Sequence, residues 1–133
     1  MIQISGLSAS LGSFALRDVS FDVPGADYGI VIGPAGAGKT VLLEAIAGVV
    51  PARSGMIRLG GRDVTSAPPE ARALGLVYQH AYLFPHLDVR RNVEYGAVAP
   101  SAAEEMLERF GLSTARDRDG RSLRGGERQL LAL

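Results

Sequence analysis

A short glycine-rich stretch limits the folds open to this sequence more than any other feature. Residues 33–40 read Gly-Pro-Ala-Gly-Ala-Gly-Lys-Thr, which matches the pattern Gly-x-x-x-x-Gly-Lys-[Ser/Thr] at every fixed position. An apolar run at residues 28–32 precedes the stretch, and a helical pattern follows it over residues 39–49. The sequence therefore predicts a buried strand, a phosphate-binding loop and a core helix in that order, which is the context that the motif requires.

The residue types of this loop suit a polyphosphate ligand. A turn with few side chains lets successive backbone N–H groups point at the phosphates, and the helix N-terminus adds its partial positive charge. We expect Lys39 to bind the β and γ phosphates of ATP, and the Thr40 hydroxyl to bind Mg²⁺. The alternative is a turn that only joins a strand to a helix, with Lys39 solvated. The predicted ATP-binding residues are Gly33, Pro34, Ala35, Gly36, Ala37, Gly38, Lys39, Thr40 and Val41.

Composition narrows the class of protein. The chain has 133 residues, of which 47% are hydrophobic and 21% charged, and its 14 basic side chains balance 14 acidic ones. Such a balance is typical of a globular domain and gives no support for nucleic acid as a partner. The sequence has no cysteine, which fits a reducing compartment. It has no apolar run of about 18 residues, so we expect neither a signal peptide nor a membrane span.

The first part of the chain has the pattern of strands. Residues 2–23 alternate between apolar and polar positions, as half-buried strands do, and a short strand with the same alternation is expected at residues 56–59. A second apolar strand is expected at residues 74–78, directly before Gln79. Together with the helix after the phosphate-binding loop, these strands predict an α/β fold.

The last part of the chain has a different character. Residues 101–110 show a helical pattern that ends at Gly111, and a further apolar, helical run ends the sequence. We therefore expect a nucleotide-binding core over residues 1–88 and a partial α-helical subdomain over residues 89–133. Around this boundary, residues 82–95 read as a loop region with four apolar residues that either join the core or form a docking surface: Leu83, Phe84, Leu87 and Val89.

A third motif lies near the end of the sequence and reads Leu123-Arg124-Gly125-Gly126-Glu127. Together with the loop at 33–40 and with Gln79, it resembles the nucleotide-binding subunit of an ATP-binding-cassette (ABC) transporter. The resemblance extends over the whole chain. It implies a P-loop NTPase core with an N-terminal antiparallel β subdomain and the start of the helical signature subdomain, and with the C-terminal part of the core missing.

The resemblance also implies roles for particular residues. In the family, the signature motif closes over the γ-phosphate of ATP that the other subunit holds, so residues 123–127 are expected to act in a dimer. Gln79 corresponds to a glutamine that contacts Mg²⁺ and reports to the membrane subunits. Phe14 is the candidate for stacking on adenine, although a core role on a half-buried strand explains it equally well. The implied partners are a second copy and membrane-spanning permease subunits, which places the chain at the cytoplasmic face of the membrane.

A narrower resemblance is carried by the phosphate-binding loop and two further segments. These segments are similar to the matching parts of the ATPase subunits of molybdate and tungstate importers. The first is Asp63-Val64-Thr65 with Pro68-Pro69-Glu70, and the second is Leu83-Phe84-Pro85-His86. The ATPase subunits of sulfate, iron and polyamine importers have much of the same sequence in these segments. We therefore expect the motor subunit of an importer, with an oxyanion such as molybdate or tungstate as its solute.

Two departures from the family pattern qualify these expectations. Arg124 stands where the signature normally has a serine. Family members also continue past the signature with an apolar strand that ends in Asp-Glu and supplies the general base, and this sequence has no such segment. We therefore expect a truncated chain that binds ATP, contains no catalytic residue, does not hydrolyse ATP and is marginally stable alone. The alternatives are a soluble, non-transport ABC-type ATPase and a degenerate nucleotide-binding remnant.

Overall fold

The computed structural model describes residues 1–97 and 99–132, and these form two units, Met1–Leu76 and Val77–Leu133. The division lies closer to the N-terminus than the boundary expected after residue 88. The segment with Gln79 therefore belongs to the helical unit. Each unit has its own apolar core.

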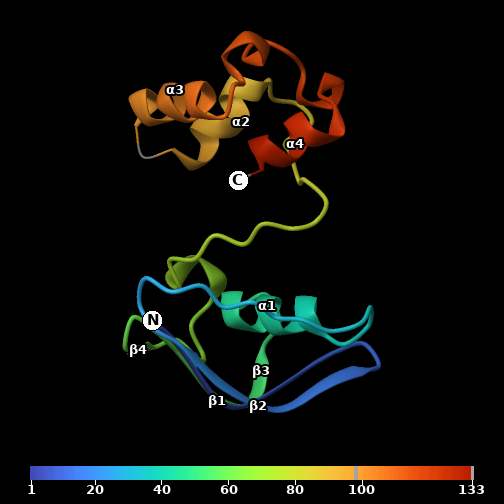
Figure 1. Ribbon diagram of the computed structural model, residues 1–133, viewed down its shortest axis with the longest axis vertical. Helices are drawn as coiled ribbons and strands as arrows, with labels where there is room; N and C mark the ends of the chain where they lie inside the picture. The colour runs from blue at the N-terminus through green and yellow to red at the C-terminus, as the bar shows by residue number, and fades with distance from the viewer. Residues whose placement is uncertain (98, 133) are drawn as a thin grey trace. The chain divides into compact units, whose positions relative to one another are not determined.

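An antiparallel sheet forms the base of the first unit (Figure 1). Its strands are β1 (Ile2–Leu11), β2 (Phe14–Val23), β3 (Ala52–Leu59) and β4 (Arg62–Asp63), in the spatial order β2-β1-β3-β4. The predicted strands over residues 2–23 are confirmed, and β3 begins earlier than the predicted residue 56. The two long neighbours of β1 both pair with it antiparallel. Alternation in the sequence was enough to predict this sheet because one of its faces is buried and the other is solvated.

Helix α1 (Lys39–Ala47) covers one face of this sheet, as Figure 1 shows. It confirms the helix that was predicted after the phosphate-binding loop. The helix ends at Gly48, whose φ of +85° is the left-handed conformation that glycine adopts without strain. Apolar side chains of the helix and the sheet form one core: Ile4, Leu7, Ala9, Val41, Leu42, Ala45, Ile46, Val50, Ile57 and Val64. Burying this face fixes the helix against the sheet.

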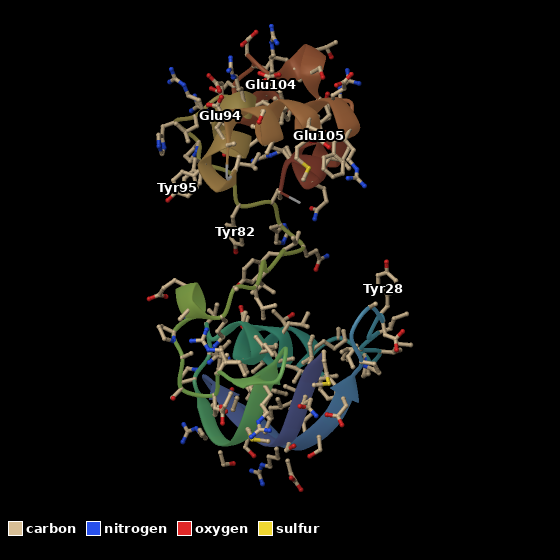
Figure 2. The ribbon with its side chains drawn as sticks, turned by 90° about the vertical axis from the view of Figure 1, so that its left-hand side faces the viewer. Tyr28, Tyr82, Glu94, Tyr95, Glu104 and Glu105 are labelled. Atoms are coloured by element: carbon tan, nitrogen blue, oxygen red, sulfur yellow. The ribbon has the colours of Figure 1, made fainter. Side chains whose placement is uncertain are left out.

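The predicted strands at residues 28–32 and 74–78 are absent, so this part of the prediction is wrong. Neither segment has regular secondary structure, and neither pairs with a strand among the described residues. Tyr28, Ile30 and Ile32 are 97%, 82% and 89% exposed, and Figure 2 shows the Tyr28 ring pointing away from the sheet. The physical reason is that an apolar run becomes a parallel strand only when neighbouring strands accept its backbone hydrogen bonds.

The exposed apolar side chains lead to a prediction about association. We expect the 133-residue polypeptide to self-associate, because burying an isoleucine side chain is worth about 1.5–3 kcal/mol. The double variant Ile30→Lys, Ile32→Lys should weaken association by about a decade or more, since charged side chains block edge pairing. Light scattering across a concentration series would measure the extent of self-association of both proteins. A wild-type sample that stays monomeric at about 100 μM would contradict the prediction.

Three helices make up most of the second unit: α2 (Val89–Gly96), α3 (Pro100–Arg109) and α4 (Gly125–Leu131). Short 3-10 helices at Ser113–Ala115 and Gly120–Ser122 connect them. The core consists of Val89, Leu107, Leu112, Ala115 and Leu123. Helix α3 confirms the predicted helix over residues 101–110, apart from its ends. No helix of residues 1–97 or 99–132 is long and apolar enough to cross a membrane.

Helix α2 lies in a segment that was expected to be a loop, so that expectation is wrong. Asp88 precedes the helix, and its carboxylate accepts a hydrogen bond of 2.8 Å from the Arg91 backbone N–H. Val89 is fully buried in the core of the unit. An aspartate directly before an apolar residue is a helix start signal that could have predicted this helix.

Candidate nucleotide-binding site

The phosphate-binding loop owes its shape to two glycines. Gly36 and Gly38 have φ values of +80° and +89°, which side chains other than glycine rarely adopt. The Ala37 N–H donates to the Pro34 carbonyl over 3.3 Å, and this bond closes the turn. Gly38 then caps the start of α1, since its carbonyl accepts from the Leu42 N–H at 2.9 Å. The glycine spacing of the motif is thus required by the backbone conformation.

Lys39 folds back over its own loop. Its Nζ atom donates to the Gly33 carbonyl at 2.9 Å and to the Pro34 carbonyl at 2.8 Å. An ammonium group has three N–H donors, so these two bonds leave one donor for an anion. Lys39 is also the only lysine of the sequence. The loop therefore holds a single ammonium group in a fixed place at the N-terminus of α1.

An open pocket of about 280 Å³ lies beside the loop and is lined by Phe14, Gly36, Gly38, Lys39, Thr40 and Val41. The Phe14 ring contacts the backbone of Gly38 so closely that a Cβ there would lie 2.3 Å from Phe14 Cζ. Phe14 is half-buried and also packs against the core of the first unit. The ring therefore lines the pocket and also packs at the edge of the core, while its stacking on adenine stays a prediction.

The residues that line the pocket include one side-chain oxygen suited to a hard cation, the Thr40 hydroxyl. Thr40 lies in the first turn of α1, is exposed, and lines the pocket next to Lys39. Mg²⁺ binds oxygen ligands and keeps several waters, so a single hydroxyl beside a phosphate site fits it. The described residues contain no cluster of three or more His, Cys, Asp or Glu side chains that could hold a metal by themselves. A cation here would depend on phosphate oxygens for much of its coordination.

The remaining predicted site residues are distributed over both units. Gly33, Pro34, Ala35 and Ala37 are exposed in the loop, outside the pocket lining. Gln79 is exposed in the second unit. The carbonyl of Tyr78, the residue before it, accepts a hydrogen bond from Gln129 Nε2 of α4 at 3.3 Å. This bond joins the Gln79 segment to the signature helix, and the motif analysis did not identify Gln129.

The signature motif forms the start of α4. Leu123 is buried in the core of the second unit, and Arg124 is exposed at the residue that precedes the helix. The Arg124 backbone N–H donates to Glu127 Oε2 at 2.8 Å. Glu127 Oε1 also lies 3.5 Å from Arg118 Nη1. The carboxylate of Glu127 therefore satisfies the start of its own helix, where a negative charge is favourable.

A tight ion pair orders the turn before the signature. Arg121 Nη2 lies 2.7 Å from Asp119 Oδ2, and the Arg121 backbone N–H donates to Asp119 Oδ1 at 2.8 Å. The hydrogen bonds from Arg121 lower the pKa of Asp119 to about 2. Because the pKa is depressed, the pair contributes stability above the usual aspartate pKa and loses it as the pH falls toward about 2. The turn is therefore held by this pair at neutral pH.

Several aromatic side chains of the second unit are exposed or partly exposed. Tyr82 and Tyr95 are 77% and 72% exposed, and both project outward in Figure 2. The Phe84 and Tyr95 rings are 4.3 Å apart. The Asn92 side chain holds this segment, because it accepts from the Phe84 N–H at 2.8 Å and donates to the carbonyls of Phe84, Leu87 and Asp88. Of the apolar residues expected to join the core or form a docking surface, Val89 belongs to the core, Leu83 packs against it, and Phe84 stays partly exposed.

Comparison with known proteins finds one family. The family model described as "ABC transporter" matches residues 16–133. The "Molybdate/tungstate import ATP-binding protein WtpC" of Archaeoglobus fulgidus is 46% identical over 129 residues, which cover 92% of this chain and 53% of that protein. The protein of the same name from Pyrococcus abyssi is 40% identical, over 100% of this chain and 41% of its own length. The "Sulfate/thiosulfate import ATP-binding protein CysA" of Mycobacterium tuberculosis is 38% identical, over 99% of this chain and 40% of its own length.

Solved structures with the same fold extend the comparison. The dimeric structure of MJ0796, described as a bacterial ABC transporter cassette, matches with a TM-score of 0.83 at 20% identity, over 99% of this chain and 67% of that chain. The ATP-binding cassette MJ1267 matches with a TM-score of 0.81 at 25% identity, over 98% of this chain and 62% of that chain. The chain thus shares the cassette fold over almost its whole length and spans about half, or less, of the curated relatives described above.

Proposed function

Because this chain belongs to the ABC transporter family, we propose that it is the ATP-binding part of an importer's motor subunit. The observation that carries the proposal is the loop at residues 33–40. Its positive-φ glycines, the anchored Lys39 and the Thr40 hydroxyl lie around one pocket at a helix N-terminus. Phosphate groups bind at such helix starts because backbone N–H groups and the helix dipole both favour negative charge.

Each residue of the loop has a distinct part in the proposed binding of MgATP. The backbone from Gly33 to Gly38 cradles the phosphates, the Lys39 ammonium pairs with the β and γ phosphates, and the Thr40 hydroxyl holds Mg²⁺. Val41 closes the pocket beside Thr40. Gln79 is proposed as a further Mg²⁺ ligand on the basis of the family resemblance. When bound, the ion neutralises part of the phosphate charge.

Nucleotide binding can be tested at Lys39 itself, because the sequence has no other lysine. We expect MgATP to protect Lys39 from an amine-reactive reagent, while the N-terminal amine serves as an internal control. Equilibrium dialysis with ATP, ADP and Mg²⁺ measures the affinity directly. A folded sample that binds neither nucleotide, and whose Lys39 reacts equally fast with and without MgATP, would rule out the proposed function.

Phe14 is proposed to stack on adenine. Stacking on an aromatic ring is worth on the order of 1–3 kcal/mol per base, so Phe14→Leu should weaken ATP binding about 5- to 100-fold. The same variant should leave the affinity for inorganic tripolyphosphate unchanged, because that ligand has no base. Isothermal titration with both ligands separates the contribution of adenine stacking from the contribution of phosphate binding. Equal weakening for ATP and tripolyphosphate would show that Phe14 acts only by supporting the loop.

We propose that the residues of this chain bind ATP without activating water for its hydrolysis. A general base must reach the attacking water, and the residues that line the pocket include no carboxylate and no histidine. The 133-residue chain should therefore release no phosphate above background while still binding MgATP. In the proposed transporter, binding and hydrolysis of ATP by the complete motor drive transport across the membrane.

The proposed setting is a dimer of motor subunits beneath two membrane-spanning permease subunits, at the cytoplasmic face of the membrane. The signature, residues 123–127, is proposed to contact ATP held by the second copy. The exposed aromatic side chains of Tyr82, Phe84 and Tyr95 are proposed to dock a permease. Two relatives are named for molybdate and tungstate import, which supports these oxyanions as the solute; the sulfate importer relative supports sulfate as the alternative. Competition between tungstate and sulfate during uptake by cells that express the transporter would decide between them.

A further inference from the structure

One charged side chain is buried in the part of the chain that the structure describes. Arg72 is 5% exposed and lies just after the 3-10 helix Pro69–Ala71. Its guanidinium donates hydrogen bonds to four backbone carbonyls. It donates from Nε to Ala67 at 2.9 Å, from Nη1 to Ala45 at 3.0 Å and Ile46 at 2.8 Å, and from Nη2 to Thr65 at 3.1 Å. Such a planar, forked set of donors is specific to arginine.

Two of these carbonyls belong to the last turn of α1. The final carbonyls of a helix lack partners within the helix, and a positive charge at this end interacts favourably with the helix dipole. Arg72 therefore caps the C-terminal end of the helix whose N-terminal end forms the nucleotide site. The other two bonds tie this end to the turn at residues 65–67 that follows β4.

Gly48 leaves the space that the guanidinium occupies. A Cβ added at this glycine would lie 2.5 Å from Arg72 Nε and 2.9 Å from Arg72 Cζ. Gly48 also has a φ of +85° and ends α1 by donating its N–H to the Ala45 carbonyl at 3.2 Å. The end of the helix and the arginine thus fit together through a residue without a side chain.

The phosphate-binding loop depends on α1 for its position. Residues 28–37 on its N-terminal side are exposed and pair with no strand among the described residues. The apolar contacts between α1 and the sheet are non-directional, so they resist separation more than they resist a small shift along the helix axis. The hydrogen bonds of Arg72 are directional and fix that position.

We propose that Arg72 is a positioning residue for nucleotide binding, which holds α1 in the register that keeps Lys39 and Thr40 ready for MgATP. The inference rests on the proposed function of the loop. Arg72 does not line the pocket, so it acts through the helix. Losing the bonds at the far end of α1 lets the helix populate positions in which the loop is less suited to phosphate, and the apparent affinity falls with the population of the competent state.

The test compares Arg72→Lys with the wild-type chain. Lysine keeps the positive charge but not the fork, so we expect a dissociation constant for MgATP raised about tenfold at a temperature where circular dichroism shows both proteins folded. Gly48→Ala should act in the same direction, because its methyl group displaces the guanidinium without removing it. Arg17→Lys, a matched change at an exposed position of β2, should leave the affinity unchanged.

A second measurement does not require nucleotide. The reaction of Lys39 with an amine reagent, followed by peptide mass spectrometry, should be faster in Arg72→Lys and Gly48→Ala than in the wild type or Arg17→Lys. The reaction is faster because, in these two variants, the hydrogen bonds from Lys39 to the Gly33 and Pro34 carbonyls are formed for less of the time. Folded variants with wild-type affinity and wild-type Lys39 reactivity would overturn the proposal, as would an Arg72→Lys chain that fails to fold. If the wild type binds no ATP, the proposed function fails, while the Lys39 reactivity still decides the role of Arg72.

Discussion

Replacing Lys39 with alanine should weaken MgATP binding by about one to two orders of magnitude or more. A charge-assisted hydrogen bond contributes about 1.5–3 kcal/mol, and Lys39→Ala removes this interaction with the phosphates. The structure adds a second loss, because Lys39 Nζ also bonds the Gly33 and Pro34 carbonyls and so holds the loop in its curved form. Equilibrium dialysis with MgATP, at a temperature where both proteins are folded, measures the effect.

Two control variants separate these contributions. Lys39→Arg keeps the charge but has a larger, planar group in place of the compact ammonium, so we expect an affinity between those of the wild type and Lys39→Ala. Arg17→Ala removes a positive charge from the exposed surface of β2 and should have little effect. If Lys39→Ala binds MgATP as tightly as Arg17→Ala does, the assignment of the phosphate site is wrong.

Gly38→Ala should damage both the proposed nucleotide site and the stability of the first unit. Its φ of +89° costs an alanine roughly 1–2 kcal/mol. The new methyl carbon would also lie 2.3 Å from Phe14 Cζ, so the ring or the loop must move. We expect a lower melting temperature and a loss of MgATP affinity of about tenfold or more, because a displaced loop no longer aims its N–H groups at the phosphates.

Gly36 provides the matched control for this variant. Its φ of +80° imposes a similar backbone cost on alanine, but a Cβ there would meet no atom within 4 Å. Gly38→Ala should therefore be more destabilising than Gly36→Ala in thermal melts. Adding Phe14→Leu should restore part of the stability of Gly38→Ala by relieving the contact. Equal melting temperatures for the two alanine variants would show that the Phe14 contact is unimportant.

The antiparallel sheet could be predicted from the sequence because its strands contain their own pairing information. Residues 2–23 alternate, and the two-residue turn at Gly12-Ser13 brings the strands together locally. The run at residues 28–32 carries no such information. A parallel strand is defined by partners that are distant in sequence, and in the described residues no partner pairs with it. Apolar composition alone therefore predicted strands that the structure does not contain.

The candidate site shows a similar division between what was predictable and what was not. The motif predicted Lys39, Thr40 and the loop glycines from their spacing alone, and Gly36, Gly38, Lys39 and Thr40 line one pocket. The contact of Phe14 with Gly38 and the bonds of Arg72 to the end of α1 arise from tertiary packing. In the sequence, an arginine shortly after a Pro-Pro segment is expected to be an exposed charge. Only the burial of Arg72 in the structure distinguishes it from the exposed arginines. The bond from Gln129 to the Tyr78 carbonyl likewise joins residues that no local pattern connects.

The position of Phe14 makes the hairpin of β1 and β2 part of the proposed nucleotide site. Leu11 pairs with Phe14 across the two-residue turn, and side chains alternate between the faces of a strand. Lengthening that turn by one residue would rotate the ring to the opposite face of the sheet and leave the pocket beside Gly38 without its aromatic wall. The pocket can thus be lost through an insertion in a hairpin, with every residue of the glycine-rich loop unchanged.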